Sequence, residues 1–146
     1  HGYIIEKMLA SDLMWSTYKA SPIVDNGVSH VILKVPTTFS LQNVSDFDGF
    51  TAMLEKTTSL SGDEFPHLIG KSLTPGKVFF VYDFLESCRD LSNLATGISL
   101  FDEQDALLII RRIAVALGKL WDTEKMIHQN LTPANITIMP DQSVKL

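Results

Sequence analysis

Five strand-like segments, with one helix-like segment between the third and the fourth, occupy the first 83 residues and constrain the fold most. Alternating apolar and polar residues predict strands at 3–9, 14–20, 28–35, 68–73 and 77–83. Apolar residues at helical spacing predict a single helix at 46–61. Because short turns join neighbouring strands antiparallel, we expect an α+β protein that begins with a five-stranded antiparallel sheet and one helix.

Turn-forming and capping residues separate these segments. Asp25-Asn26-Gly27 precedes the third strand, and Thr74-Pro75-Gly76 joins the last two. Ser45 or Asp46 is suited to cap the helix, which Gly62-Asp63 should end. The apolar positions of this helix are Phe47, Phe50, Met53 and Leu54.

The remaining residues follow a helical pattern that ends in a hairpin. A short helix is expected at 90–96, and Asp102 is placed to cap a longer one at 103–121. The longer helix is apolar on more than one face, which predicts that neighbours bury it on several sides. Its apolar positions include Ala106, Leu107, Leu108, Ile109, Ile110, Ile113, Val115, Leu117 and Leu120. A hairpin should follow, with 135–138 and 144–146 flanking the turn at 140–142.

Composition excludes several functional classes. With 146 residues, 45% of them hydrophobic and 20% charged, the chain is expected to fold as one domain or two small lobes. A net charge of −5 argues against a nucleic-acid partner, and Arg111-Arg112 is interpreted as the solvated edge of a helix. No run approaches the length of a membrane span, and the histidines and the one cysteine give no metal-ligand spacing.

Two further features bear on the origin of the chain. Cys88 is the single cysteine, so an internal disulfide is excluded and a reducing, cytoplasmic location is expected. The chain begins with His1-Gly2 rather than with methionine, and we expect it to be part of a longer protein.

The segment "MIHQNLTPANITI" (126–138) carries the most specific motif. His128 and Asn135 lie seven residues apart, with Leu131 and Pro133 between them, directly after the long helix. A polar helix-to-strand connection is the alternative interpretation of this segment.

The order of the elements, the "VILK" sequence at 31–34 and the His…Asn segment together resemble the protein kinase superfamily. The resemblance covers nearly the whole chain. It implies a protein-kinase-like fold in which residues 1–85 form the small lobe and hinge. Residues 86–146 would then form the truncated start of the large lobe, a partial helical lobe that ends in the hairpin.

The resemblance implies a nucleotide-phosphate role for Lys34, with Glu55 as its partner from the helix. The alternatives are a surface lysine on an edge strand and a solvated helix glutamate. Asp83 to Leu85 would correspond to the hinge, whose backbone groups contact adenine; a buried edge strand has the same apolar pattern. The three glycine positions of the phosphate-covering loop fall on Ala10, Asp12 and Trp15, so this loop is not expected to cradle a triphosphate.

The same resemblance assigns roles to the residues of the His…Asn segment. Asn130 occupies the position of the catalytic base, and an amide cannot accept a proton near neutral pH. Thr132 replaces the lysine that supports the transferred phosphate, and Gln129 replaces an arginine that contacts a phosphorylated activation loop. Asn135 matches the residue that holds magnesium in the family.

The resemblance leads to three functional hypotheses. The first is a catalytically impaired, pseudokinase-like domain that acts in signalling as a scaffold or regulatory binding module. The second is a divergent ATP-dependent Ser/Thr kinase that uses Mg²⁺, with its remaining catalytic elements, including D-F-G, beyond Leu146. The third is a nucleotide-sensing domain without phosphotransfer. In the family, the rest of the large lobe covers the long helix, so we expect exposed apolar surface on 103–121 that a protein partner or self-association covers.

Overall fold

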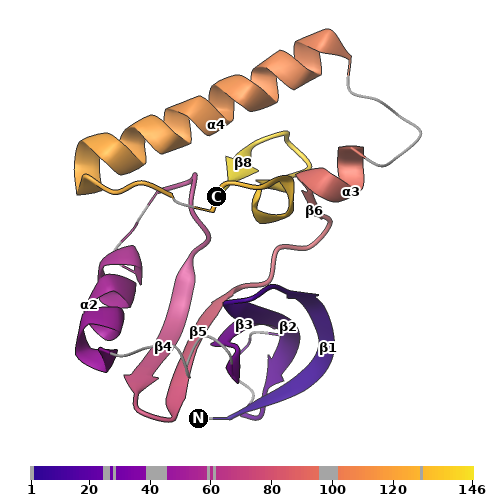
Figure 1. Ribbon diagram of the computed structural model, residues 1–146. Helices are drawn as coiled ribbons and strands as arrows, with labels where there is room; N and C mark the ends of the chain where they lie inside the picture. The colour runs from indigo at the N-terminus through magenta and orange to yellow at the C-terminus, as the bar shows by residue number, and fades with distance from the viewer. Residues whose placement is uncertain are drawn as a thin grey trace. The chain divides into compact units, whose positions relative to one another are not determined.

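The computed structural model describes residues 2–24, 27, 29–38, 46–58, 60, 62–95, 102–128 and 130–146. The chain divides into two compact units (Figure 1). Unit 1 consists of His1–Ser59 and His67–Phe84, and unit 2 consists of Leu60–Pro66 and Leu85–Leu146. Among the described residues, two buried apolar clusters lie in unit 1 and one lies in unit 2, so each unit has a hydrophobic core of its own.

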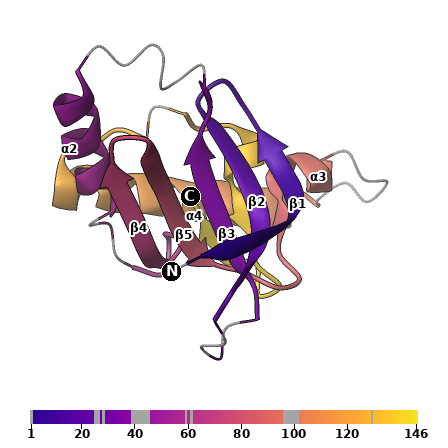
Figure 2. The same cartoon turned by 90° about the horizontal axis from the view of Figure 1, so that it is seen from below.

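Unit 1 is built on a five-stranded antiparallel sheet (Figure 2). Its strands are β1 (Tyr3–Ser11), β2 (Trp15–Pro22), β3 (Val31–Pro36), β4 (Leu68–Thr74) and β5 (Lys77–Asp83). They are arranged in the order β1-β2-β3-β5-β4, and every neighbouring pair is antiparallel. The predicted α+β class with a five-stranded antiparallel sheet is therefore confirmed for the described residues.

The two faces of the sheet are both apolar near β5. Phe80 and Val81 are adjacent in this strand and therefore point to opposite faces. Val81 belongs to a cluster with Ala20, Val31 and Leu33. Phe80 belongs to the other cluster, with Val78 and Leu54. Helix α2 (Phe47–Thr58) supplies Leu54, so it covers the Phe80 face of the sheet.

Local capping positions helix α2 as the sequence predicts. The Asp46 carboxylate accepts a hydrogen bond from the Gly49 N–H at 2.9 Å. Phe47 and Phe50 pack against the Leu54 cluster, whereas Met53 is exposed, so its assignment to the apolar stripe was wrong. Met53 adjoins Leu54 and therefore projects about 100° around the helix from it, away from the sheet. The alternative cap, Ser45, lies outside the described residues, as do Asp25 and Asn26 of the predicted turn.

Unit 2 combines a long helix with a small sheet. Its elements are β6 (Arg89–Asp90), α3 (Leu91–Ala95), α4 (Glu103–Glu124), the 3-10 helix η1 (Pro133–Asn135), β7 (Thr137–Ile138) and β8 (Val144–Lys145). The short strands form a sheet in the order β6-β7-β8, in which β6 was not predicted. The core joins Ile109 of α4 to Ile136, Ile138 and Val144.

The ends of α4 follow from local chemistry. The Asp102 carboxylate accepts the Asp105 N–H at 2.8 Å, which confirms the predicted N-cap. The helix continues to Glu124 rather than stopping at Trp121. Lys125 then adopts a left-handed conformation with φ 52°, and its N–H bonds carbonyl oxygens of the last turn.

Burial of α4 differs from the sequence prediction. Its buried residues are Ile109, Ala116 and Leu120, which lie on one face. Leu107 is 59% exposed, Ile110 60% and Trp121 52%. The prediction that neighbours bury the helix on several sides is therefore wrong for the described chain, because packing elements of unit 2 cover one face. The predicted exposed apolar surface is present on this helix.

Candidate functional site

The His…Asn segment follows α4 in unit 2 and is tied together by its own groups. The Asn130 N–H donates to the His128 carbonyl at 2.8 Å, and the Asn135 side-chain Nδ2 donates to the Asn130 carbonyl at 3.1 Å. The Asn135 backbone N–H donates to the Thr132 carbonyl at 2.9 Å. Gln129 lies outside the described residues. The side chains at 130, 132 and 135 are neutral, so this segment offers amide and hydroxyl groups and no carboxylate.

Lys34 lies in β3 on the face that α2 covers. It pairs across the ladder with Phe80, and cross-strand partners share a face of the sheet. Its Nζ lies 5.9 Å from the centre of the Trp15 ring, within the range of a cation–π contact. Burial lowers the pKa of Lys34, and the nearby Asp12 charge acts in the opposite direction. Lys34 is thus half-buried, not a fully solvated surface lysine.

The turn between β1 and β2 lies beside Lys34 and is closed by hydrogen bonds. Oδ1 of Asp12 accepts the N–H groups of Met14 and Trp15, each at 2.7 Å. The Asp12 N–H donates to the Trp15 carbonyl at 2.9 Å. Thr37, just beyond β3, donates its hydroxyl to the Leu13 carbonyl at 2.6 Å and its N–H to the Met14 carbonyl at 2.9 Å. The turn is therefore held both internally and by β3.

Glu55 does not meet Lys34. It is exposed on α2, and among the described residues it forms no ion pair with Lys34. The carboxylate that acts on the charge of Lys34 is instead that of Asp12. The Lys34–Glu55 pairing expected from the resemblance is therefore not formed among the described residues, because Glu55 is exposed to solvent.

Asp83 and Leu85, the first and last residues of the expected hinge, both have hydrogen-bond partners. The Asp83 N–H donates to the His67 carbonyl at 3.1 Å, and the Asp83 carboxylate lies 2.9 Å from Nδ1 of His67. The Leu85 carbonyl accepts the thiol of Cys88 at 3.0 Å. Burial raises the pKa of that thiol. Asp83 and Lys34 belong to unit 1, whereas Leu85, Asn130, Thr132 and Asn135 belong to unit 2.

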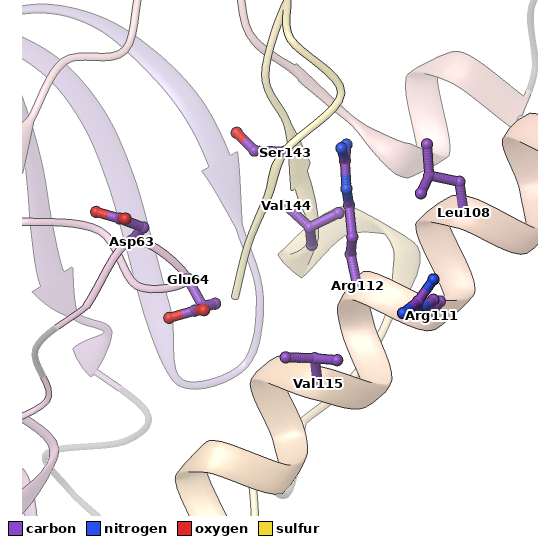
Figure 3. Close-up of a pocket in the computed structure, with 8 residues that line it drawn as sticks. All are labelled: Asp63, Glu64, Leu108, Arg111, Arg112, Val115, Ser143 and Val144. Carbon is purple, nitrogen blue, oxygen red and sulfur yellow. The ribbon is translucent and has the colours of Figure 1, made fainter.

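Unit 2 also contains a pocket of about 300 Å³ that the sequence did not indicate (Figure 3). Asp63 and Glu64 lie on one side of it and the side chains of α4 lie on the other, with the β8 segment between them. The lining residues are Asp63, Glu64, Leu108, Arg111, Arg112, Val115, Ser143 and Val144. The apolar residues come from α4 and β8, and the charged ones from two separate segments. The pair Arg111-Arg112 was the available signal, and it was interpreted only as a solvated edge.

The acidic side of this pocket is anchored by lysines. Glu64 forms an ion pair with Lys119, and the hydrogen bond from Lys119 is the main cause that lowers the pKa of Glu64. Nζ of Lys145 donates to the Asp63 carbonyl at 2.9 Å and to the Phe65 carbonyl at 3.2 Å. The 60–66 segment is thereby fastened to α4 and β8.

Across the described ranges, no group of three or more His, Cys, Asp and Glu side chains is placed to hold a metal ion. Nor does any helix in the described part of the chain have the length and apolar character needed to cross a membrane. No protein-family model and no curated protein matches the chain.

Proposed function

We propose that the chain is a protein-kinase-like domain that does not catalyse phosphoryl transfer and acts as a scaffold or regulatory binding module. The observation that carries this proposal is the chemistry of the His128–Asn135 segment. Asn130 stands where the resemblance implies a proton acceptor, and the amide group of Asn135 is bonded to the Asn130 carbonyl.

The missing charges bear directly on the reaction. Without a general base, the proton of an attacking hydroxyl lacks assistance worth about 10²–10⁴-fold in rate. Phosphoryl transfer depends on positioned charge, and Thr132 supplies a hydroxyl where the resemblance implies an ammonium. A domain with these substitutions keeps the frame of the segment without its reactive groups.

The order of the elements supports the kinase-like part of the proposal. In the described chain, helix α2 comes between β3 and β4 of a five-stranded antiparallel sheet, and the long helix α4 comes after β5. The His…Asn segment and the β7–β8 hairpin come directly after α4, as the resemblance implies.

The binding role is supported by an apolar row on α4, which we define as Leu107, Ile110, Ala114 and Trp121. Their spacing of three, four and seven residues brings all four to one side of the helix. All four are exposed in the described chain. In our proposal a protein partner or a second copy of the chain covers this row inside the cell, a location in keeping with the unpaired Cys88.

A phosphotransfer assay tests the proposed absence of catalysis. The full-length protein is incubated with labelled ATP, Mg²⁺ and general Ser/Thr substrates, beside a Lys34→Ala variant. We expect equal, background incorporation from both. Incorporation that depends on Lys34 would overturn the proposal in favour of a divergent kinase.

A second assay tests the proposed binding surface. Ile110→Lys places a charge in the apolar row, and Arg111→Lys is the matched control because it keeps the charge of a neighbouring exposed residue. Sedimentation equilibrium of the full-length protein should show weaker association for Ile110→Lys only. Equal association of both variants would remove the apolar row from the proposal.

Nucleotide binding without chemistry is the second candidate, and the half-buried Lys34 favours it. In that case ATP would bind in unit 1 through Lys34, with the backbone of Asp83 as a further contact. A ligand at a concentration 100 times its Kd stabilises the folded state by about 2.7 kcal/mol, which a thermal shift detects. An increase in the melting temperature with millimolar ATP, lost in Lys34→Ala, would support this candidate over a pure scaffold.

A further inference from the structure

We propose that two copies of the chain pair through the apolar row of α4, with the two helices antiparallel and a two-fold axis at Ala114. A two-fold interface brings the same surface of both copies together, so that surface has to complement itself. The inference deepens the proposed function and rests on it for the row being a binding surface. It adds which partner covers the row and in which register.

The apolar row lies on the side of α4 that the described part of unit 2 leaves uncovered. The buried residues of α4 lie roughly 140° around the helix axis from Ala114. The labelled elements α3, β6 and β8 of unit 2 all lie on one side of α4 (Figure 1). Leu107, Ile110 and Trp121 are each more than half exposed. The row therefore presents large apolar side chains to a molecule that pairs with unit 2.

Side chains at equal distances before and after Ala114 complement one another in size. Leu107 and Trp121 both lie seven residues from Ala114, and antiparallel helices place each opposite the other. Ile110 and Gly118 both lie four residues from it. Gly118 is exposed, and in the described chain a Cβ at this position would meet nothing within 4 Å beyond the nearby backbone of its own helix. The second copy's Ile110 therefore finds open space beside Gly118.

The charged residues at the two ends of the row also complement one another. Glu103 lies eleven residues before Ala114 and Lys125 lies eleven residues after it, so antiparallel helices place opposite charges face to face twice. Nζ of Lys125 lies 5.7 Å from the centre of the Trp121 ring, which puts the ammonium beside the row. Both charged residues are exposed, and neither forms an ion pair with another described residue. A parallel pair would place like charges together, so the charges favour the antiparallel arrangement.

An exchange of charges tests the register by sedimentation equilibrium of the full-length protein. Glu103→Lys and Lys125→Glu should each weaken dimerisation by about tenfold, because each turns two attractive pairs into two repulsive ones. The double variant that carries both substitutions should recover the wild-type affinity. Glu86→Lys, at an exposed position of unit 2 outside α4, is the matched control and should change dimerisation little.

A loss of helix stability would give a different result from a loss of pairing. Both substitutions place an unfavourable charge at an end of α4, so their effects on the helix should add in the double variant, whereas dimerisation should recover. A monomeric wild type would overturn the proposal and would mean that other residues of the full-length protein, or a different protein, cover the row. Single reversals that weaken association no more than Glu86→Lys, or a double variant that stays weak, would overturn it equally.

A second variant tests the contact at Gly118 while favouring the helix. Gly118→Gln replaces a weak helix former, so the melting temperature should not fall, but the new side chain occupies the space that Ile110 of the second copy fills. Dimerisation should weaken by about tenfold or more, because the interface is overpacked at two symmetric places. Thr123→Gln, at an exposed position on the opposite side of α4, is the matched control. Equal association of these two variants would contradict the antiparallel arrangement.

These experiments separate failure of the pairing from failure of the proposed function. If Ile110→Lys weakens association but the charge exchange does not restore it, the row still takes part in association and only the antiparallel register is wrong. Phosphotransfer that depends on Lys34 would overturn the proposed absence of catalysis, and it would leave the result of the charge exchange unchanged.

Discussion

Strand β5 and helix α4 are both rich in apolar residues, but unit 1 covers both sides of β5 while unit 2 covers one side of α4. Val78, Phe80 and Val81 of β5 are buried against two different clusters, one on each face of the sheet. In α4, Ile109 is 5% exposed whereas its neighbour Ile110 is 60% exposed. The difference indicates that unit 1 completes its core around β5 from its own residues, and that α4 keeps an apolar side available for another surface.

The largest effect is expected from truncation in β5. Phe80→Ala should destabilise unit 1 by about 3–5 kcal/mol, because it removes a buried ring that Trp15, Tyr82 and the α2 cluster surround. Hydrogen exchange of the β3 and β5 amides measures the loss within that unit. Ile4→Ala, at an exposed position of β1, is the control and should change exchange little. A small change in exchange for Phe80→Ala would mean that the Phe80 ring is not buried in the core of unit 1.

The adjacent pair in α4 gives the most direct test of the one-sided burial. Ile109→Ala should cost unit 2 about 2–4 kcal/mol, since it leaves a cavity against Ile136, Ile138 and Val144. Ile110→Ala should stay within about 0.5 kcal/mol. Hydrogen exchange of the α4 amides compares the two variants. Similar costs at both positions would show that the Ile110 side of the helix is also covered in solution.

The N-cap of α4 should contribute a smaller amount. Asp102→Ala removes the acceptor of the Asp105 N–H and should cost about 0.5–2 kcal/mol. Asp122→Ala, an exposed carboxylate near the other end of the same helix, is the matched control and should be neutral or slightly stabilising. Amide exchange in the first turn of α4 separates the two. Equal exchange rates in both variants would show that the Asp102 cap does not stabilise the helix.

The smallest effect is expected from the ion pair that anchors the 60–66 segment. The Lys119 hydrogen bond lowers the pKa of Glu64 in the folded state, so its stabilisation is present above the unfolded pKa of about 4.3 and is lost as pH falls through the lower folded value. Exchange of unit 2 amides from pH 7 to pH 3 should therefore show a steeper loss for the wild type than for Glu64→Gln. The difference at pH 7 should be below about 1 kcal/mol. If the wild type and Glu64→Gln lost protection equally as the pH falls, the ion pair with Lys119 would not be the source of the pH dependence.

Elements with a strong local pattern could be predicted from the sequence. Alternation identified β1 to β5, and Asp46 and Asp102 marked helix starts because an N-cap depends on residues within one turn. Strand β6 was missed because two residues, Arg89 and Asp90, carry no periodicity; its pairing with β7 is a long-range event. The pocket on unit 2 was missed for the same reason, since three distant segments line it.

The candidate site could be predicted only in part from the sequence. The sequence placed Lys34 on a strand and Asn130 and Asn135 in one segment after a helix, and their placement follows these local elements. It paired Lys34 with Glu55, whereas the carboxylate that acts on Lys34 is that of Asp12. Which carboxylate lies near a lysine of the sheet depends on how the covering helix is rotated about its axis. The spacing of residues along the chain does not contain that information.

The sequence by itself determined the local conformations of this protein: the alternating strands, the capped helices and the neutral chemistry of the His128–Asn135 segment. These follow from interactions within a few residues of each other. Only the tertiary structure decided which side of α4 is buried, and which carboxylate acts on the charge of Lys34. Burial and charge compensation depend on what long-range folding brings alongside a residue, so the same apolar helix and the same lysine could have had other neighbours.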